Sequence, residues 1–152
     1  MNLTKIFSTL TALGLLILVV SVFSDNTLGQ GVTRPVPNLD KVVKGMPRGD
    51  EQQIRVMTAN FKPGDQTVFH THRFPVTVFI IEGEFTLNLA DRKEPVVIKA
   101  GESFVEPVGV KMTGYNRSTT SPLRVVIFYV SDKDTPFLDP IESDLHNSHP
   151  KP

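Results

Sequence analysis

The chain has 152 residues, with 16 Lys and Arg against 16 Asp and Glu, no cysteine, 12 prolines, 10 glycines and 10 phenylalanines. This length suits one domain, and the zero net charge argues against a general nucleic-acid binder, which needs a basic face. Without cysteine there is no disulfide, cysteine-ligated zinc, thiol nucleophile, iron–sulfur cluster or lipid-anchoring cysteine. The many turn residues between short apolar runs favour an all-β domain.

Residues 1–29 have the pattern of a secretory signal peptide. Lys5 precedes an apolar run at 10–23, which is interrupted only by Thr11, Gly14 and Ser21. The run is shorter than the ~20 residues of a membrane span, and small residues follow it. We therefore predict export to a periplasmic or secreted location, with no membrane attachment after cleavage. An uncleaved N-terminal membrane anchor is the alternative.

The rest of the chain divides into three segments. Residues 30–49 contain Pro35, Pro37 and Pro47 and show little periodicity, which predicts an extended arm. Residues 132–152 are polar and contain proline, which predicts a flexible C-terminal tail. Residues 50–131 between them form the predicted β-domain. The strands expected there are 54–59, 68–72, 75–81, 84–89, 96–99, 103–106, 111–116 and 123–130.

This number of short strands, with no helical period between them, predicts a closed or double-sheet β architecture. The segments 76–81 and 125–130 are apolar on both faces of the expected strands. A strand of this kind needs something to cover its outer face. We predict that a second copy of the chain does so, as a homodimer formed by sheet-on-sheet packing. Coverage by the N-terminal arm is the alternative.

The chemistry of the sequence is concentrated at His70 and His72. Residues two apart on a strand point to the same face, so both imidazoles project together. Their surroundings, Gly64-(x5)-His70-Thr71-His72-(x3)-Val76-(x6)-Gly83, resemble the first motif of the cupin superfamily. A second stretch, Gly101-(x5)-Pro107-Val108-Gly109-(x2)-Met112-(x3)-Asn116, resembles the second cupin motif with every spacing in register. The resemblance implies a double-stranded β-helix, the cupin jelly-roll barrel, over residues 50–131.

The resemblance also implies a metal site, from which this sequence departs. In metal-binding cupins, two histidines and a glutamate of the first motif and a histidine of the second motif hold one divalent ion. The histidine positions of the first motif are His70 and His72, but Val76 stands at the glutamate position and Met112 at the position of the last histidine. Two neutral imidazoles alone hold a metal weakly.

Three interpretations stay open. In the first, the barrel pocket binds a small molecule without a metal, and the histidine pair forms hydrogen bonds or acts as a general base. In the second, the chain is a metal-dependent cupin enzyme of the dioxygenase, lyase or isomerase type, with one divalent or copper ion held by His70, His72 and Met112. In the third, the histidines are structural and the protein works through its surface. The pocket residues expected are His70, His72, Val76, Val78, Phe104 and Met112.

Overall fold

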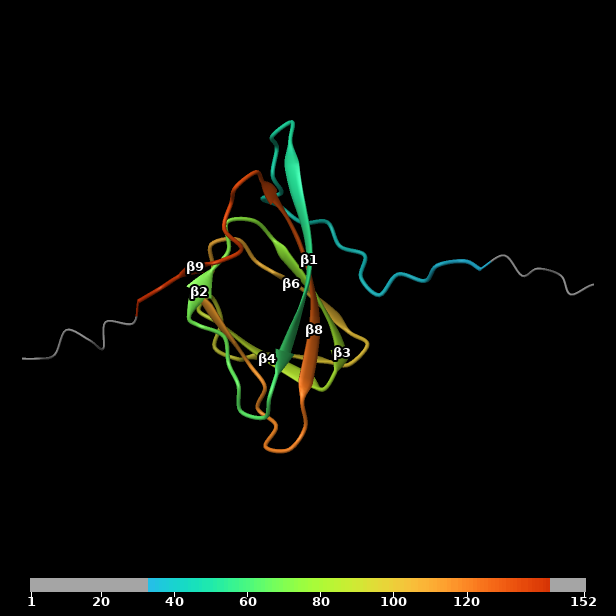
Figure 1. The fold of residues 1–152 in the computed structure, drawn as a ribbon, viewed down its shortest axis with the longest axis vertical. Helices are drawn as coiled ribbons and strands as arrows, with labels where there is room; N and C mark the ends of the chain where they lie inside the picture. The colour runs from blue at the N-terminus through green and yellow to red at the C-terminus, as the bar shows by residue number, and fades with distance from the viewer. Residues whose placement is uncertain (1–32, 143–152) are drawn as a thin grey trace, which may run out of the picture. The chain divides into compact units, whose positions relative to one another are not determined.

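The computed structural model describes residues 33–142, so the predicted signal region 1–29 and the last ten residues lie outside the description. The described part is an all-β barrel (Figure 1). Its strands are β1 (Gln52–Phe61), β2 (His70–Thr71), β3 (Val76–Glu82), β4 (Glu84–Leu89), β5 (Val96–Lys99), β6 (Ser103–Glu106), β7 (Met112–Tyr115), β8 (Leu123–Asp132) and β9 (Asp139–Pro140). Among residues 33–142 there is no helix long and apolar enough to span a membrane.

The strands form two antiparallel sheets, as the sequence predicted. One has the order β1-β8-β3-β6 and the other the order β5-β4-β7-β2-β9. Consecutive strands β3 and β4 lie in different sheets, and so do β6 and β7. The chain therefore crosses repeatedly between two layers, as in a jelly roll. The all-β, double-sheet prediction is confirmed.

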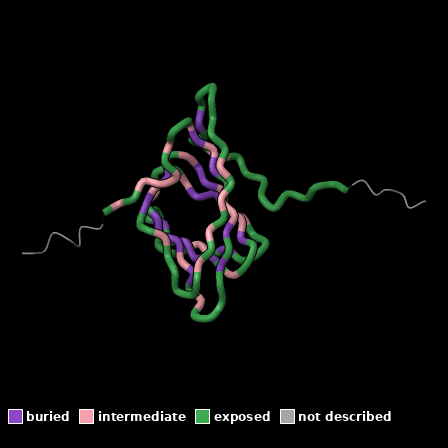
Figure 2. The backbone as a smooth tube through the Cα atoms, in the orientation of Figure 1, coloured by how far each residue is buried: buried purple, intermediate pink, exposed green. Residues whose placement is uncertain are grey.

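The core lies between the sheets because the strands bury alternate side chains. Figure 2 shows buried residues alternating with more exposed ones along the barrel strands. In β3 the burial follows a period of two, which directs one row of side chains into the barrel. Both sheets contribute to the apolar core, which includes Val76, Val78, Ile80, Phe85, Leu87, Leu89, Ile98, Leu123 and Val125.

The turn between β3 and β4 depends on Gly83. Its φ is +81°, a left-handed conformation that costs little for glycine alone. A Cβ at this position would also lie 2.5 Å from the carbonyl oxygen of Pro122, on the loop before β8. The glycine thus lets β3 pass into the opposite sheet while the loop before β8 packs closely against it.

The folded unit continues beyond residue 131, where we expected the barrel to end and a flexible tail to begin. Of that segment, the structure describes residues 132–142, and they lie against the barrel. β9 pairs with β2, and the Ile141 amide donates to the Phe69 carbonyl oxygen at 2.8 Å. This packing leaves no local pattern in the sequence, because the pairing partner lies about 70 residues away and β9 contains only two residues.

The segment predicted as an arm contains no strand over residues 33–49. Its middle part lies beside β6, where Lys41 Nζ is 5.9 Å from the centre of the Phe104 ring. Residues 41–44 line a shallow groove with Pro75, Val105 and Val108. The described arm therefore covers the β6 side of the first sheet.

Candidate functional site

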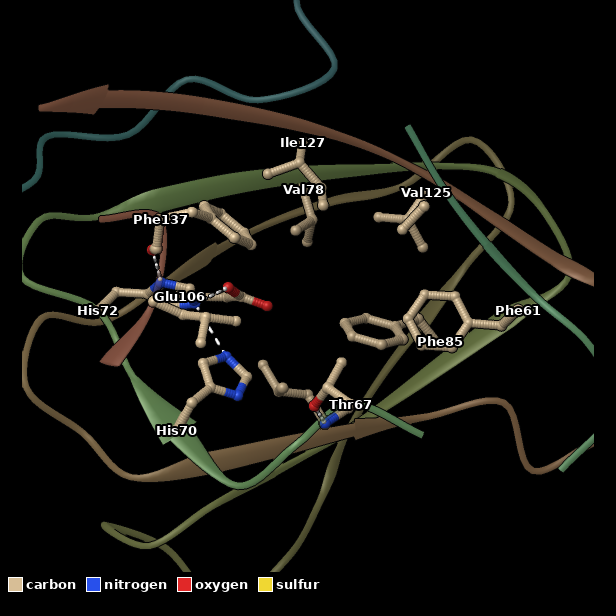
Figure 3. A pocket seen from close by; sticks show the side chains of 14 residues that line it. Phe61, Thr67, His70, His72, Val78, Phe85, Glu106, Val125, Ile127 and Phe137 are labelled. Atoms are coloured by element: carbon tan, nitrogen blue, oxygen red, sulfur yellow. Dashed lines mark hydrogen bonds and ion pairs between the residues drawn. The ribbon is translucent and has the colours of Figure 1, made fainter. Parts of the chain in front are cut away.

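A cavity of about 110 Å³ lies inside the barrel between the two sheets. Its walls are mostly apolar, and its polar groups are gathered at one end. Figure 3 shows Phe61 and Phe85 at the end opposite His70, His72 and Glu106. The lining residues are Ala59, Phe61, Thr67, His70, His72, Val78, Phe85, Leu87, Glu106, Gly114, Val125, Ile127, Phe137 and Leu138. A space of this size admits a small organic molecule, since dry cavities of roughly 150 Å³ take benzene.

The two histidines are fixed by hydrogen bonds to backbone carbonyl groups. His70 Nδ1 donates to the Val68 carbonyl oxygen at 2.7 Å, and His72 Nδ1 donates to the Phe137 carbonyl oxygen at 2.7 Å. A carbonyl oxygen can only accept, so both Nδ1 atoms carry hydrogen. Both rings are buried, with 4% of His70 and 1% of His72 exposed. Their Nε2 atoms are therefore the groups left for chemistry.

These Nε2 atoms meet each other and a carboxylate. His70 Nε2 lies 3.0 Å from His72 Nε2, which in turn lies 3.1 Å from Glu106 Oε2. With Nδ1 already protonated, a neutral ring has only a lone pair on Nε2, and three acceptors this close would repel one another. One hydrogen on His72 Nε2 satisfies both contacts. The geometry of the cluster of His70, His72 and Glu106 is thus satisfied by one shared proton, an arrangement with no net charge.

Burial favours the neutral form of the His70 ring. Desolvation lowers the pKa of His70 below 6.5, and the nearby His72 adds to this, while the bond to Val68 and the charge of Glu106 act in the opposite direction. His70 is consequently the neutral member, and its Nε2 accepts the hydrogen of His72. Glu106 is only 5% exposed, and its Oε2 atom lies 3.1 Å from His72 Nε2.

The segment after β8 closes the polar end of the cavity. The Phe137 ring packs 5.0 Å from the His72 ring and 5.6 Å from the Tyr129 ring, measured between centres. At the surface, Arg73 holds this segment in place, because its guanidinium donates to both carboxylate oxygens of Asp139 at 2.7 and 2.8 Å. Hydrogen bonding from Arg73 lowers the pKa of Asp139. The segment after β8 therefore both orients His72 and forms part of the cavity wall.

Of the six residues expected in the pocket, the structure places three in the lining of the cavity. His70, His72 and Val78 line the cavity, whereas Val76, Phe104 and Met112 are not among its lining residues. Val76 and Met112 are fully buried in the core, and Met112 is the direct strand partner of His70. Phe104 is half-buried and packs against the core below Lys41. Whether any of these residues binds a ligand or metal stays a prediction.

Glu106 and Phe137 are the site residues that the sequence reasoning missed. Glu106 is the direct cross-strand partner of Val76, so its carboxylate lies on the face where the cupin motif places one. A signal for this was present, since Glu106 is two residues from Phe104 and therefore shares the strand face that we had assigned to the pocket. Phe137 gave no comparable signal, because its contacts depend on the return of the chain after β8.

The donor groups at the polar end of the cavity are two imidazoles and one carboxylate. Among residues 33–142, no group of three or more His, Cys, Asp or Glu side chains is arranged to hold a metal ion. Two of the four positions that the cupin motifs supply are the apolar residues Val76 and Met112. The Nε2 atoms of His70 and His72 are engaged with each other at 3.0 Å.

Several solved structures have a similar fold. The DMSP lyase DddQ from Ruegeria pomeroyi shares 19% identity at a TM-score of 0.47, over 55% of this chain and 41% of that one. YhaK from Escherichia coli shares 18% identity at a TM-score of 0.48, over 61% of this chain and 44% of that one. A cupin-2 domain containing protein from Shewanella frigidimarina shares 18% identity at a TM-score of 0.39, over 54% of this chain and 72% of that one. The chain thus spans less than half the length of the first two, and at these TM-scores the likenesses carry no argument about function.

No curated protein matches the sequence. The model of the family described as "Cupin domain" matches residues 57–129, which run from β1 to β8 and include both sequence motifs, the histidine pair and Glu106. This match agrees with the resemblance of the two motifs and with the double-sheet barrel. The chain carries a cupin domain and belongs to the cupin superfamily.

Proposed function

We propose that this cupin is a small-molecule-binding protein whose ligand occupies the barrel cavity. The observation that carries the proposal is the division of the cavity into an apolar body and a polar end made by His70, His72 and Glu106. Ligand sites commonly have this construction, in which apolar walls provide affinity and a few polar groups fix orientation. A volume of about 110 Å³ restricts the ligand to a few non-hydrogen atoms.

The charge of the cluster selects the head group of the ligand. Because the shared proton cancels the charge of Glu106, a ligand anion finds no unpaired positive charge, and it would face a carboxylate. The Glu106 carboxylate offers acceptor lone pairs instead, whereas the lone pair of His70 Nε2 is already engaged with His72. The ligand we propose is therefore a small, uncharged and mainly apolar molecule with one hydroxyl or N–H group that donates to the cluster.

A matched set of probes tests this proposal. Isobutanol, isobutyrate and isobutyl chloride share one body and differ in whether the head group is an uncharged donor, an anion or neither. We expect isobutanol alone to raise the melting temperature saturably, since a ligand of the native state stabilises it. For so few atoms the dissociation constant is on the order of 1 mM. Equal effects of all three probes, or none, contradict the proposal.

Variants separate binding in the cavity from an effect on the surface. Glu106→Gln keeps the size of the side chain but removes the charged acceptor, so we expect weaker binding of isobutanol. Glu94→Gln makes the same change at an exposed position between β4 and β5 and serves as the control. Loss of binding in both variants, or in neither, argues against a role for the His–Glu cluster.

The second candidate is a metal-dependent cupin enzyme using His70 and His72, with copper through Met112. One observation favours it: both Nδ1 atoms donate to carbonyl oxygens, an arrangement that metal-binding histidines share. Elemental analysis of the purified protein, followed by addition of copper, zinc, iron or manganese, tests it. A stoichiometric metal lost in the His70→Ala, His72→Ala double variant supports this candidate. Absence of metal and of metal-induced stabilisation rules it out.

We also propose that the protein is exported and cleaved within or at the end of residues 1–29, and that it binds no nucleic acid. The apolar run after Lys5 and the zero net charge support these two proposals, respectively. Mass spectrometry of the protein recovered from its native compartment tests the first. A mass that includes residues 1–29, with the protein in the membrane fraction, would favour the anchored alternative.

A further inference from the structure

The side chain of Thr67 adds a hydroxyl group to the wall of the cavity, outside the cluster of His70, His72 and Glu106. Among the lining residues, all of which belong to the described part of the chain, it is the one further polar side chain. Thr67 is half-buried, and Figure 3 shows it between His70 and Phe85. The cavity wall therefore has a second polar point, which the proposed function has not used.

Two hydrogen bonds to Gly114 on β7 fix the position of Thr67. The Thr67 amide donates to the Gly114 carbonyl oxygen at 2.8 Å, and the Gly114 amide donates to Thr67 Oγ1 at 2.9 Å. Because Oγ1 accepts from Gly114, its own hydrogen must point elsewhere. Within residues 33–142 the hydroxyl makes no hydrogen bond as a donor. This hydrogen is thus available to a molecule in the cavity.

The cluster and Thr67 offer opposite halves of a hydrogen bond. The hydrogen on His72 Nε2 is already engaged with His70 and Glu106, so the cluster presents acceptor lone pairs of the carboxylate. Thr67 presents a donor. A ligand that satisfies both carries one donor and one acceptor, and a volume of about 110 Å³ requires these two groups to be close together in a small molecule.

A carbonyl oxygen suits the donor of Thr67 better than a second hydroxyl group does. A hydroxyl would bring a further hydrogen, which would be left unpaired among apolar walls at a cost in free energy. A carbonyl oxygen only accepts and brings none. The donor and the acceptor then lie on neighbouring carbon atoms of the ligand.

We propose that the ligand is a small α-hydroxy carbonyl compound, whose hydroxyl group donates to Glu106 and whose carbonyl oxygen accepts from Thr67. This inference rests on the proposed function, since it names the chemical class of the molecule that occupies the same cavity. Apolar side chains such as Val78 and Leu87 surround its remaining carbon atoms. Thr67 is then the residue that selects for the carbonyl group.

Isobutanol and hydroxyacetone form a matched pair of probes. Both carry one hydroxyl group and have the same number of non-hydrogen atoms, but the ketone oxygen of hydroxyacetone replaces a methyl group of isobutanol. Moving a ketone from water into an apolar cavity costs free energy unless a hydrogen bond awaits it. We expect calorimetric titration of the wild type to show that hydroxyacetone binds at least as tightly as isobutanol.

Two variants of Thr67 assign this preference to its hydroxyl group. Thr67→Val keeps the shape of the side chain and removes the donor, so hydroxyacetone should bind about tenfold more weakly while isobutanol binding changes little. Thr67→Ser keeps the hydroxyl group and should keep the wild-type preference. Comparing the two probes within each variant cancels the effect of losing the bond from Gly114.

NMR of hydroxyacetone labelled at its ketone carbon gives a measurement on the wild type alone, which stands even if Thr67→Val does not fold. We expect the bound signal to stay near its frequency in water, because the bond from Thr67 replaces those from water. A shift to the frequency of an apolar solvent overturns the proposal. Equal weakening of both probes in Thr67→Val, or isobutanol binding without hydroxyacetone binding, also overturns it. If neither probe binds the wild type, the proposed function fails as well.

Discussion

At the residue scale, the site depends on where one carboxylate lies. The cupin motif places it at the position of Val76, and here the direct strand partner Glu106 brings it to the same face of the sheet. Its Oε2 atom lies 3.1 Å from His72 Nε2. The apolar Val76 at the glutamate position of the motif is thus accompanied by a buried His–Glu cluster on the same face of the sheet.

The lowered pKa of His70 makes stability depend on pH. Between its pKa in the folded protein and 6.5, the unfolded chain binds this proton more readily, so the free energy of unfolding rises with pH across that window. We expect the melting temperature to fall as the solution is acidified below 6.5. His70→Gln should flatten this dependence, as measured by thermal unfolding at a series of pH values. An unchanged slope in the variant contradicts a buried, neutral His70.

Gly114 sets the size of the cavity. A Cβ at this position would collide with the ring of Phe85, which lines the cavity. We expect Gly114→Ala to displace the ring, to destabilise the protein by about 1–3 kcal/mol and to weaken isobutanol binding. Calorimetric titration and chemical denaturation measure the two effects.

Gly101→Ala provides the matched control for this change. Gly101 lies in an exposed turn with φ +86°, so alanine there is strained but has no neighbour within 4 Å. We expect it to cost about 1 kcal/mol or more of stability and to leave binding unchanged. If Gly114→Ala binds isobutanol as the wild type does, the ligand does not occupy the cavity beside Phe85.

At the scale of elements, the segment between β8 and β9 connects the surface to the site. Its Phe137 carbonyl oxygen accepts from His72, and its end is held by the pairing of β9 with β2. Few contacts fasten so short a strand, so we expect this segment to open before the barrel unfolds. Opening would expose the polar end of the cavity and give a ligand its route of entry.

We expect the ion pair between Arg73 and Asp139 to restrain this opening. Arg73→Ala removes both hydrogen bonds to Asp139, but the pair is exposed and adds little to global stability. We expect faster hydrogen exchange at the Ile141 amide, with an unchanged melting temperature. Arg92→Ala, at an exposed turn residue paired only with its neighbour Asp91, should change neither quantity. Equal exchange in the wild type and Arg73→Ala would show that the pair does not hold the segment.

At the scale of the whole molecule, the sequence predicted the barrel better than the site. Alternation along segments such as 84–89 and glycines at turns such as Gly83 are local signals, so the strands and the double-sheet fold follow from them. The pairing of Glu106 with His72 depends on strand register, and the closure by Phe137 depends on a contact 65 residues apart. Such contacts leave no periodic mark on the sequence.

The most direct test of the central claim is nitrogen NMR of the histidine rings during titration with isobutanol. We predict that the Nε2 signals of His70 and His72 shift together and reach saturation, because the hydroxyl group joins the hydrogen bonds that these atoms make. In Glu106→Gln the shift should be weak or absent. Saturable binding of isobutanol that leaves both Nε2 signals unmoved would contradict the account.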